Sequence, residues 1–435
     1  MSATSFTEWI GMERVEHLIV GAGVSGLAFA NFVDGDDYLI VEADTEIGGY
    51  CKTVKRDGFV WDYSGHFFHF KRPEMERYLL DRMPDDEVKV VVKQSDIVFK
   101  GKRVDFPFQK NIHQLPQEDF IECLYDLFFK EEQYGTDPPE NFEQMLYQKF
   151  GRGIAERFLI PYNEKLYACP MSSLDADAMG RFFPYADVED IVRNMKSSDN
   201  ASYNATFTYP RGGAIRYVQA LKHDVPDEKI AFSERLESID LKAKVARTNK
   251  REIAFEYLIS SAPFDQLMRM TTLPHEPAAL SYNKVLVFNL GFDGKSWDDV
   301  HWVYFPERDT SFYRIGFYDN IFDTDRMSLY VELGYAADAE VNVEEAKARV
   351  LADLERHGII DGHKLVASHH VVLDPAYVHI NSAGQEQVDS GMAALHARGV
   401  YSIGRYGGWT YCSIEDNMVE ARDLARTLNR AAGVV

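Results

Sequence analysis

Residues 15–26 read VEHLIVGAGVSG and decide the fold class of this chain. The first six of them predict a buried strand, and the glycines lead directly into residues 27–33, an apolar stretch that predicts a helix. A second strand is predicted at residues 38–41 and ends in Glu42, 21 positions after Gly21. Strand, glycine turn, helix, strand and acid in this order are typical of a dinucleotide-binding βαβ unit.

The glycines and the acid each have a physical role in such a unit. Glycine allows a tight turn and the close approach of a pyrophosphate to the helix N-terminus, and the acid accepts a hydrogen bond from a ribose hydroxyl. NAD and FAD are both bound in this way. A second glycine pair, Gly48 and Gly49, lets the backbone pass close to a cofactor extended along the sheet, a pattern that resembles FAD-dependent oxidoreductases. We therefore expect FAD.

The C-terminal part of the chain is expected to return to this cofactor. Residues 399–403 predict a strand leading into GRYGG at 404–408, and residues 415–429 predict an amphipathic helix. The N-terminus of that helix would face the electron-rich edge of the flavin, and Arg405 would meet the pyrophosphate. The expected cofactor contacts are Gly21, Gly23, Val24, Ser25, Gly26, Glu42, Ala43, Gly49, Tyr50, Gly65, His66, Leu236, Arg405, Asn417 and Met418.

Composition and charge exclude several classes of protein. The chain has 435 residues, 46% of them apolar and 27% charged, which is globular composition for two or three domains and excludes a disordered or fibrous protein. Subtracting 69 acidic from 47 basic residues gives −22, a charge that repels nucleic acid and anionic membranes. We expect neither as a partner, so any bound phosphate must be held by a few placed cations.

The cysteines and the N-terminal residues favour a reducing compartment. The first twelve residues have no basic region, and the longest mostly apolar stretch, 18–33, is interrupted by three glycines. We therefore expect a soluble, cytoplasmic protein. The cysteines are too widely spaced for a zinc or redox CxxC unit and too few for a disulfide framework: Cys51, Cys123, Cys169 and Cys412.

Hydrophobic periodicity divides the rest of the chain. Residues 115–195 carry helical periodicity, whereas shorter segments predict strands at 89–99, 284–290, 302–305, 328–333 and 367–373. The predicted fold class is α/β: a Rossmann-type FAD-binding domain, an inserted helical domain and an antiparallel β-sheet substrate domain. The FAD-binding domain is assigned residues 1–80, 210–275 and 390–435, the helical insertion 110–200, and the sheet domain 85–109, 201–210 and 276–389.

A family resemblance rests on short motifs that occur in order along nearly the whole chain. They are VDFPFQKN at 104–111, PYN at 161–163, GR at 180–181, NATF at 204–207, WVYFP at 302–306, FYR at 312–314 and GRYG at 404–407. Together they resemble the UDP-galactopyranose mutases, closer to the eukaryotic type, within the FAD-dependent amine-oxidase-like flavoproteins. The resemblance implies a redox-neutral interconversion of UDP-galactopyranose and UDP-galactofuranose, in which N5 of reduced FAD attacks the anomeric carbon. NAD(P)H would be the external reductant, and the protein a monomer or homodimer.

The resemblance also implies which residues form the site. Arg181 and Arg314 match two arginines that bind the substrate diphosphate, a task suited to the rigid guanidinium fork. His66 matches a histidine placed against the flavin ring, and these three residues are the expected catalytic set. The expected substrate contacts are Tyr304, Tyr377, Tyr411 and Asn204 at the diphosphate, Gln109 and Asn163 at the uridine, and Trp302 and Phe106 at the nucleotide.

The chain departs from the family pattern at several positions. Phe106 replaces a tyrosine, residues 412–417 are shorter than the eukaryotic counterpart, and Ser64 stands where glycine is usual. These departures leave open a mutase for a different nucleotide sugar. An FAD-dependent oxidase or desaturase of the amine-oxidase type is a second alternative, and a flavin-binding protein without activity a third. His66 and His69 form an HxxH pair without a third ligand at suitable spacing, so no metal site is predicted.

Overall fold

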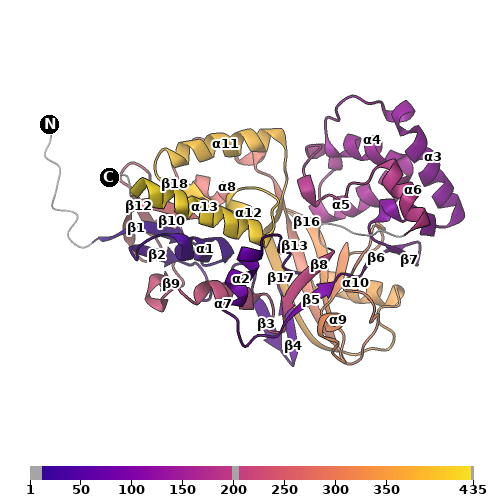
Figure 1. The fold of residues 1–435 in the computed structure, drawn as a ribbon, viewed down its shortest axis with the longest axis horizontal. Coiled ribbons are helices and arrows are strands. Elements are labelled where there is room, and N and C mark those ends of the chain that lie inside the picture. Colours follow the sequence, from indigo (N-terminus) through magenta and orange to yellow (C-terminus); the bar gives the residue numbers. More distant parts are fainter. Residues whose placement is uncertain (1–11, 198–204, 433–435) are drawn as a thin grey trace.

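The computed structural model describes residues 12–197 and 205–432. Two β-sheets lie side by side in the elongated molecule, and a cluster of helices from the middle of the sequence forms its far end (Figure 1). This arrangement confirms the α/β fold class predicted from the sequence. The domain boundaries given above stay a prediction, and Asn204 lies outside the described residues.

The first sheet contains the predicted βαβ unit. β1 (Glu13–Val20) lies parallel to β2 (Tyr38–Val41) and to β12 (Glu252–Ser260), and α1 (Val24–Phe32) connects β1 to β2. In the part of the chain that the structure describes, this sheet has seven strands in the order β10-β11-β12-β1-β2-β9, with β18 also paired to β12. The remaining strands are β9 (Ile230–Ala231), β10 (Leu236–Asp240), β11 (Val245–Thr248) and β18 (Val400–Ser402).

Helices cover both faces of this sheet. Ile19 shares a hydrophobic core with residues of α1, α7 and α13, whereas its neighbours Leu18 and Val20 share another with residues of α8 and α11. Burial on both faces explains the apolar residues 18–20 of β1 and the apolar sequence of β2. No helix in the described ranges combines the length and apolarity needed to span a membrane. The helices around the sheet are α2 (Pro73–Leu80), α7 (Ile215–Lys222), α8 (Phe264–Arg269), α11 (Ser382–His396), α12 (Gly404–Gly407) and α13 (Ile414–Ala432).

The second sheet is mostly antiparallel. Its described strands run in the order β17-β13-β16-β15-β14-β6-β7, and β6 and β14 form one parallel pair that the purely antiparallel prediction did not include. The helix α10 (Val343–Arg356) shares a hydrophobic core with one face of the sheet, so the opposite face is free to line a site. The strands are β6 (Ser95–Phe99), β7 (Lys102–Asp105), β13 (Tyr282–Phe292), β14 (Trp302–Tyr304), β15 (Arg314–Phe317), β16 (Ser328–Ala336) and β17 (Leu365–Val378).

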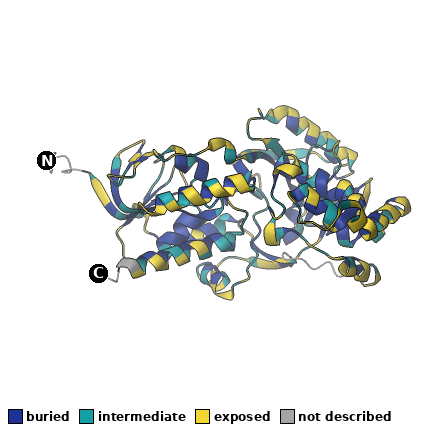
Figure 2. Ribbon diagram, turned by 90° about the horizontal axis from the view of Figure 1, so that it is seen from above, coloured by how far each residue is buried: buried dark blue, intermediate teal, exposed yellow. Residues whose placement is uncertain are grey.

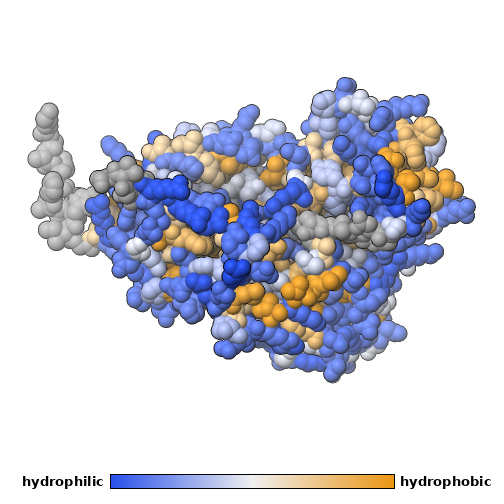
Figure 3. Space-filling view, viewed as in Figure 1, coloured by the Kyte–Doolittle hydropathy of each residue, from blue (hydrophilic) through white to orange (hydrophobic). Residues whose placement is uncertain are grey.

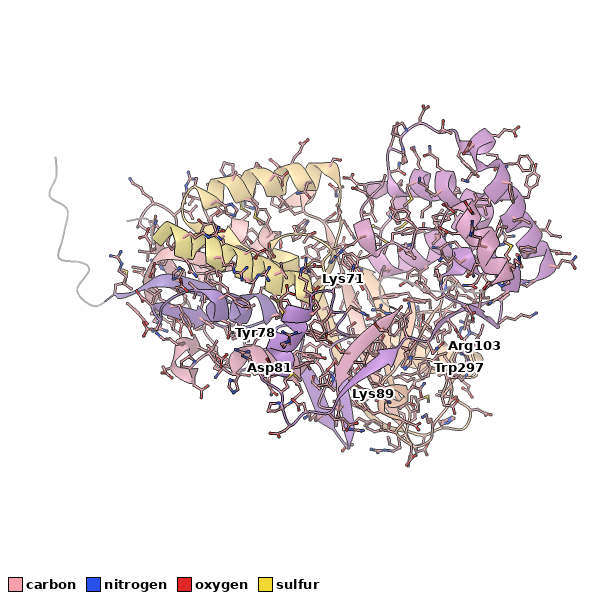
Figure 4. All side chains as sticks on the ribbon, viewed as in Figure 1. Lys71, Tyr78, Asp81, Lys89, Arg103 and Trp297 are labelled. Carbon is pink, nitrogen blue, oxygen red and sulfur yellow. The ribbon has the colours of Figure 1, made fainter. Side chains whose placement is uncertain are left out.

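Smaller elements join the two sheets. The strand predicted over residues 89–99 is divided, because β5 (Val88–Val92) pairs with β8 (Thr206–Pro210) while β6 belongs to the second sheet. Lys89 on β5 donates to the carbonyl of Ile321 in α9 (Asp319–Phe322), and Arg103 lies over the ring of Trp297 (Figure 4). A two-stranded hairpin, β3 (Thr53–Arg56) and β4 (Phe59–Asp62), completes the junction.

The helical end of the molecule contains α3 (Gln117–Tyr134), α4 (Phe142–Ile154), α5 (Ile160–Tyr167) and α6 (Val188–Lys196). α3 and α4 pack so closely that a Cβ on Gly153 would lie 2.7 Å from the Cα of Cys123. The helices have buried and exposed faces (Figure 2). Ile121, Tyr125 and Phe128 on α3 are exposed. Hydrophobic surface is visible at this end of the molecule (Figure 3).

Asp62 is a buried carboxyl at the junction of the two sheets. It accepts hydrogen bonds from the hydroxyl of Tyr209 at 2.7 Å, the hydroxyl of Thr53 at 2.5 Å and the amide of Ala214 at 3.0 Å. The side chain of Asn289 on β13 donates to its backbone carbonyl at 2.9 Å. Burial raises the pKa of Asp62 to about 7. One residue therefore ties β3, β4, β8, α7 and β13 together.

We expect Asp62→Ala to destabilise the protein by about 3 kcal/mol or more, because it leaves three buried donors without an acceptor. Asp62→Asn should lower the stability by less.

The stability contribution of Asp62 should depend on pH. Because the folded-state pKa lies above the unfolded value, the stabilising contribution of Asp62 is full at acid pH and is lost as the pH rises through about 7. The melting temperature of Asp62→Asn relative to wild type should therefore rise between pH 5 and pH 8. A constant difference would contradict the raised pKa.

Candidate active site

One large cavity of about 990 Å³ extends from the glycine turn of the first sheet to the second sheet and the helical end. Most of the residues expected from the sequence to form the site line it. These are Gly21, Gly23, Val24, Ser25, Glu42, Ala43, Gly49, Tyr50, Gly65, His66, Leu236, Arg405 and Asn417 from the expected cofactor set, and Phe106, Asn163, Trp302, Tyr304, Arg314, Tyr377 and Tyr411 from the expected substrate and catalytic sets.

The three glycines of the turn, Gly21, Gly23 and Gly26, are required for different reasons. A Cβ on Gly26 would lie 1.9 Å from the carbonyl oxygen of Gly21, and Gly21 itself has φ +101°. Both positions require glycine for the fold itself. A Cβ on Gly23 would meet no atom of the chain closer than 3.8 Å, from Gly49. Its missing side chain therefore serves whatever occupies the cavity.

Glu42 is fixed at the carboxyl end of β2. Its carboxylate accepts hydrogen bonds from the backbone amides of Ala22 at 2.7 Å and Asp44 at 2.8 Å, and it lines the cavity beside Ala43. A carboxylate held in this way still has lone pairs for ribose hydroxyls. Together with the open space at Gly23, this donor and acceptor arrangement fits FAD.

His66 lies between the glycine end and the second sheet. Burial and the nearby guanidinium of Arg405 lower the pKa of His66 to about 4, so the ring is neutral near pH 7. Its Nδ1 atom is buried and has no hydrogen-bond partner among the described residues. A neutral ring that lines the cavity suits contact with a flavin ring system.

Tyr304, Arg314 and Glu332 form a row across three adjacent strands of the second sheet. Tyr304 pairs with Arg314 between β14 and β15, and Arg314 pairs with Glu332 between β15 and β16. Arg314 Nε lies 2.5 Å from Glu332 Oε2 and Nη2 lies 2.9 Å from Oε1. All three residues line the cavity. The row brings a buried ion pair to its wall.

Arg405 is a further cation of the cavity wall. Its guanidinium carbon lies 4.5 Å from the ring centroid of Tyr411 and 5.2 Å from that of Tyr377. It donates to the carbonyl of Cys412 at 3.4 Å, and within the described ranges it forms no ion pair. An unneutralised guanidinium between two phenols is suited to binding an anion.

The far end of the cavity is aromatic. Phe106 and Tyr304 have ring centroids 5.0 Å apart, and Trp302 Nε1 donates to the hydroxyl of Tyr304 at 2.8 Å. Asn163 donates to the carbonyl of Leu159 at 2.7 Å, while its buried Oδ1 has no partner in the described part of the chain. These groups give this end of the cavity an aromatic lining with one amide.

Four expected site residues do not line the cavity. Gly26 and Met418 are packed into the core, and Gln109 is buried with its amide donating to the carbonyl of Pro184. Arg181 has a 44% exposed side chain and forms an ion pair with Asp416 at the start of α13. Its expected role as a catalytic residue stays a prediction.

Three residues that line the cavity were not predicted as site residues from the sequence: Glu332, Ser64 and Tyr313. Glu332 is one charged residue within the apolar segment 328–333, which was assigned to a strand. A charge in the middle of a buried strand requires a partner, and this was the available signal.

Comparison with known proteins identifies the family. The model for flavin containing amine oxidoreductases matches residues 25–426. The chain belongs to this family. It is 24% identical over 268 residues, 58% of its length, to a chloroplastic protoporphyrinogen oxidase of Nicotiana tabacum, and 20% identical over 256 residues, 55% of its length, to a UDP-galactopyranose mutase of Mycoplasma pneumoniae. These matches span 48% and 60% of the two relatives.

A solved structure is similar over almost the whole chain. It is a reduced UDP-galactopyranose mutase with a TM-score of 0.88 and 27% sequence identity, and the match covers 97% of this chain and 94% of that protein. The flavin amine-oxidase family and the fit of the glycine turn together indicate an FAD-binding protein. Its overall fold is similar to that of a reduced UDP-galactopyranose mutase.

The two glycines provide a matched test of the cofactor site. Gly23→Ala should leave the fold intact but weaken FAD binding by roughly thirtyfold, about 2 kcal/mol, because its methyl group enters the space left for the pyrophosphate. Gly26→Ala should instead prevent folding. The ratio of flavin absorbance to protein absorbance measures the FAD content of each variant, and far-ultraviolet circular dichroism measures whether the variant is folded. Full flavin content in Gly23→Ala would exclude this position as a phosphate contact.

Proposed function

We propose that this protein is a flavin-dependent, redox-neutral mutase that interconverts the pyranose and furanose forms of a nucleotide-diphosphate sugar, most simply UDP-galactopyranose and UDP-galactofuranose. The observation that carries the proposal is the pair of guanidinium groups, Arg314 and Arg405, in one cavity with His66. The similarity to a reduced UDP-galactopyranose mutase over 97% of the chain supports it.

The chain's own groups suit a departing diphosphate. Arg314 has its Nη1 donors free of described partners, Arg405 is unneutralised, and the phenol of Tyr377 lies beside both charges. Charged donors bind phosphate oxygens strongly, and fixed donors stabilise charge that develops on a leaving group. When bound and reduced, FAD would supply the nucleophilic N5 that attacks the anomeric carbon. NAD(P)H as its reductant, and a monomer or homodimer of the eukaryotic type, belong to the same proposal.

The nucleotide would lie at the aromatic end. Phe106, Trp302 and Asn163 line this part of the cavity. Arg181 would reach the diphosphate only after leaving Asp416, with which it is paired at the rim.

An amine oxidase is the competing function. A cationic amine entering this cavity would meet Arg405, which no described carboxylate neutralises, and the repulsion would disfavour binding. To separate the two functions, the protein is reduced with dithionite without oxygen and given UDP-galactofuranose. Formation of the pyranose supports the mutase function. Bleaching of the oxidised flavin by an amine or another substrate would instead indicate an oxidase and contradict the mutase function.

Arg314→Ala should lower kcat/KM of the reduced enzyme for UDP-galactofuranose by about 10² to 10³, because it removes a charged donor from the leaving group. Arg308→Ala is the control, since Arg308 pairs with Glu164 on the surface and has a 64% exposed side chain. Chromatographic assay of both nucleotide sugars measures the effect. Wild-type turnover in Arg314→Ala would remove the proposed role of this arginine.

A further inference from the structure

Glu332 poses an electrostatic problem in this site. Its side chain is 1% exposed, it lines the cavity, and it carries a negative charge where the proposed substrate is an anion. A buried carboxylate is costly in free energy unless it is paired and hydrogen bonded. The hydrogen bonds that Glu332 accepts compensate for this cost.

The carboxylate holds Arg314 by one edge only. It accepts from Nε and from one Nη2 hydrogen, with N–O distances of 2.5 and 2.9 Å. A guanidinium has five N–H donors in a fixed fork, so two Nη1 hydrogens and one Nη2 hydrogen remain. In the described part of the chain no residue accepts from Nη1. The free edge is the one that binds two phosphate oxygens at once.

A hydroxyl holds the carboxylate in turn. Ser64 donates to Glu332 Oε1, the same oxygen that accepts from Arg314 Nη2. Ser64 begins the turn that carries His66: its carbonyl accepts from the amide of His66 at 2.7 Å and from the hydroxyl of Tyr318 at 3.1 Å. The arginine on the second sheet is thereby connected to the histidine turn.

We propose that Glu332 is a positioning residue for anion binding: with Ser64 it fixes the guanidinium of Arg314 so that the Nη1–Nη2 edge faces the diphosphate. The identity of the anion rests on the proposed function. The role of Glu332 goes beyond the proposed function. A carboxylate that only repelled the anion would weaken anion binding, whereas a carboxylate that orients Arg314 strengthens it.

The test measures binding of UDP and of inorganic pyrophosphate to the FAD-loaded protein by calorimetry. Glu332→Gln cannot accept from both guanidinium nitrogens, so we expect UDP to bind about tenfold more weakly. Ser64→Ala keeps the ion pair and should weaken binding about threefold, which keeps the test available if Glu332→Gln does not fold. Asp119→Asn, which alters a buried carboxylate paired with Arg157 away from the cavity, is the control.

A double variant separates positioning from general destabilisation. If Glu332 acts through Arg314, Glu332→Gln should no longer weaken UDP binding in the Arg314→Ala background. An equal loss in both backgrounds, or tighter binding of UDP by Glu332→Gln, would overturn the proposal while leaving the mutase in place. Binding of pyrophosphate but not UDP by wild type would instead overturn the proposed substrate, and the Glu332 variants would then be judged with pyrophosphate. Binding of neither would overturn both.

Discussion

Charge placed in one large, partly buried cavity is the constraint on which this site depends. The whole chain carries a formal charge of −22, yet two guanidinium groups, on Arg314 and Arg405, line one cavity. Taking charges out of water is costly, so each must be compensated by the chain or by a ligand. Glu332 compensates Arg314, while Arg405 has only aromatic faces and a carbonyl within the described residues. The part of the cavity around Arg405 therefore holds a cation that no described carboxylate pairs with.

The cavity exists because two sheets with different packing meet there. The first sheet is covered by helices on both faces and contributes its glycine turn at the carboxyl ends of its parallel strands. The second sheet is covered by α10 on one face and presents polar residues on the other. Asp62, bonded to groups from β3, β8 and α7, holds the junction in place.

A shared fold leaves the reaction open in this family. The same chain is similar to a protoporphyrinogen oxidase and to a UDP-galactopyranose mutase at comparable identity. Its family membership indicates a flavin protein but does not select between these reactions. The choice between oxidation and a redox-neutral isomerisation depends on the groups that face the substrate. Here those groups include the guanidinium groups of Arg314 and Arg405, the carboxylate of Glu332 and several phenols.

The sequence by itself determined the local elements and the cofactor end of the site. β1, α1 and β2 were predictable because strand and helix periodicities and the glycine turn are written in consecutive residues. The tertiary structure decided which side chains meet. The pairs Arg314–Glu332 and Arg181–Asp416 join residues 18 and 235 positions apart, and no local pattern encodes such partners. Burial likewise decided that Gly26 supports the fold while Gly23 faces the cavity, because the space around a Cβ depends on the packing of distant segments.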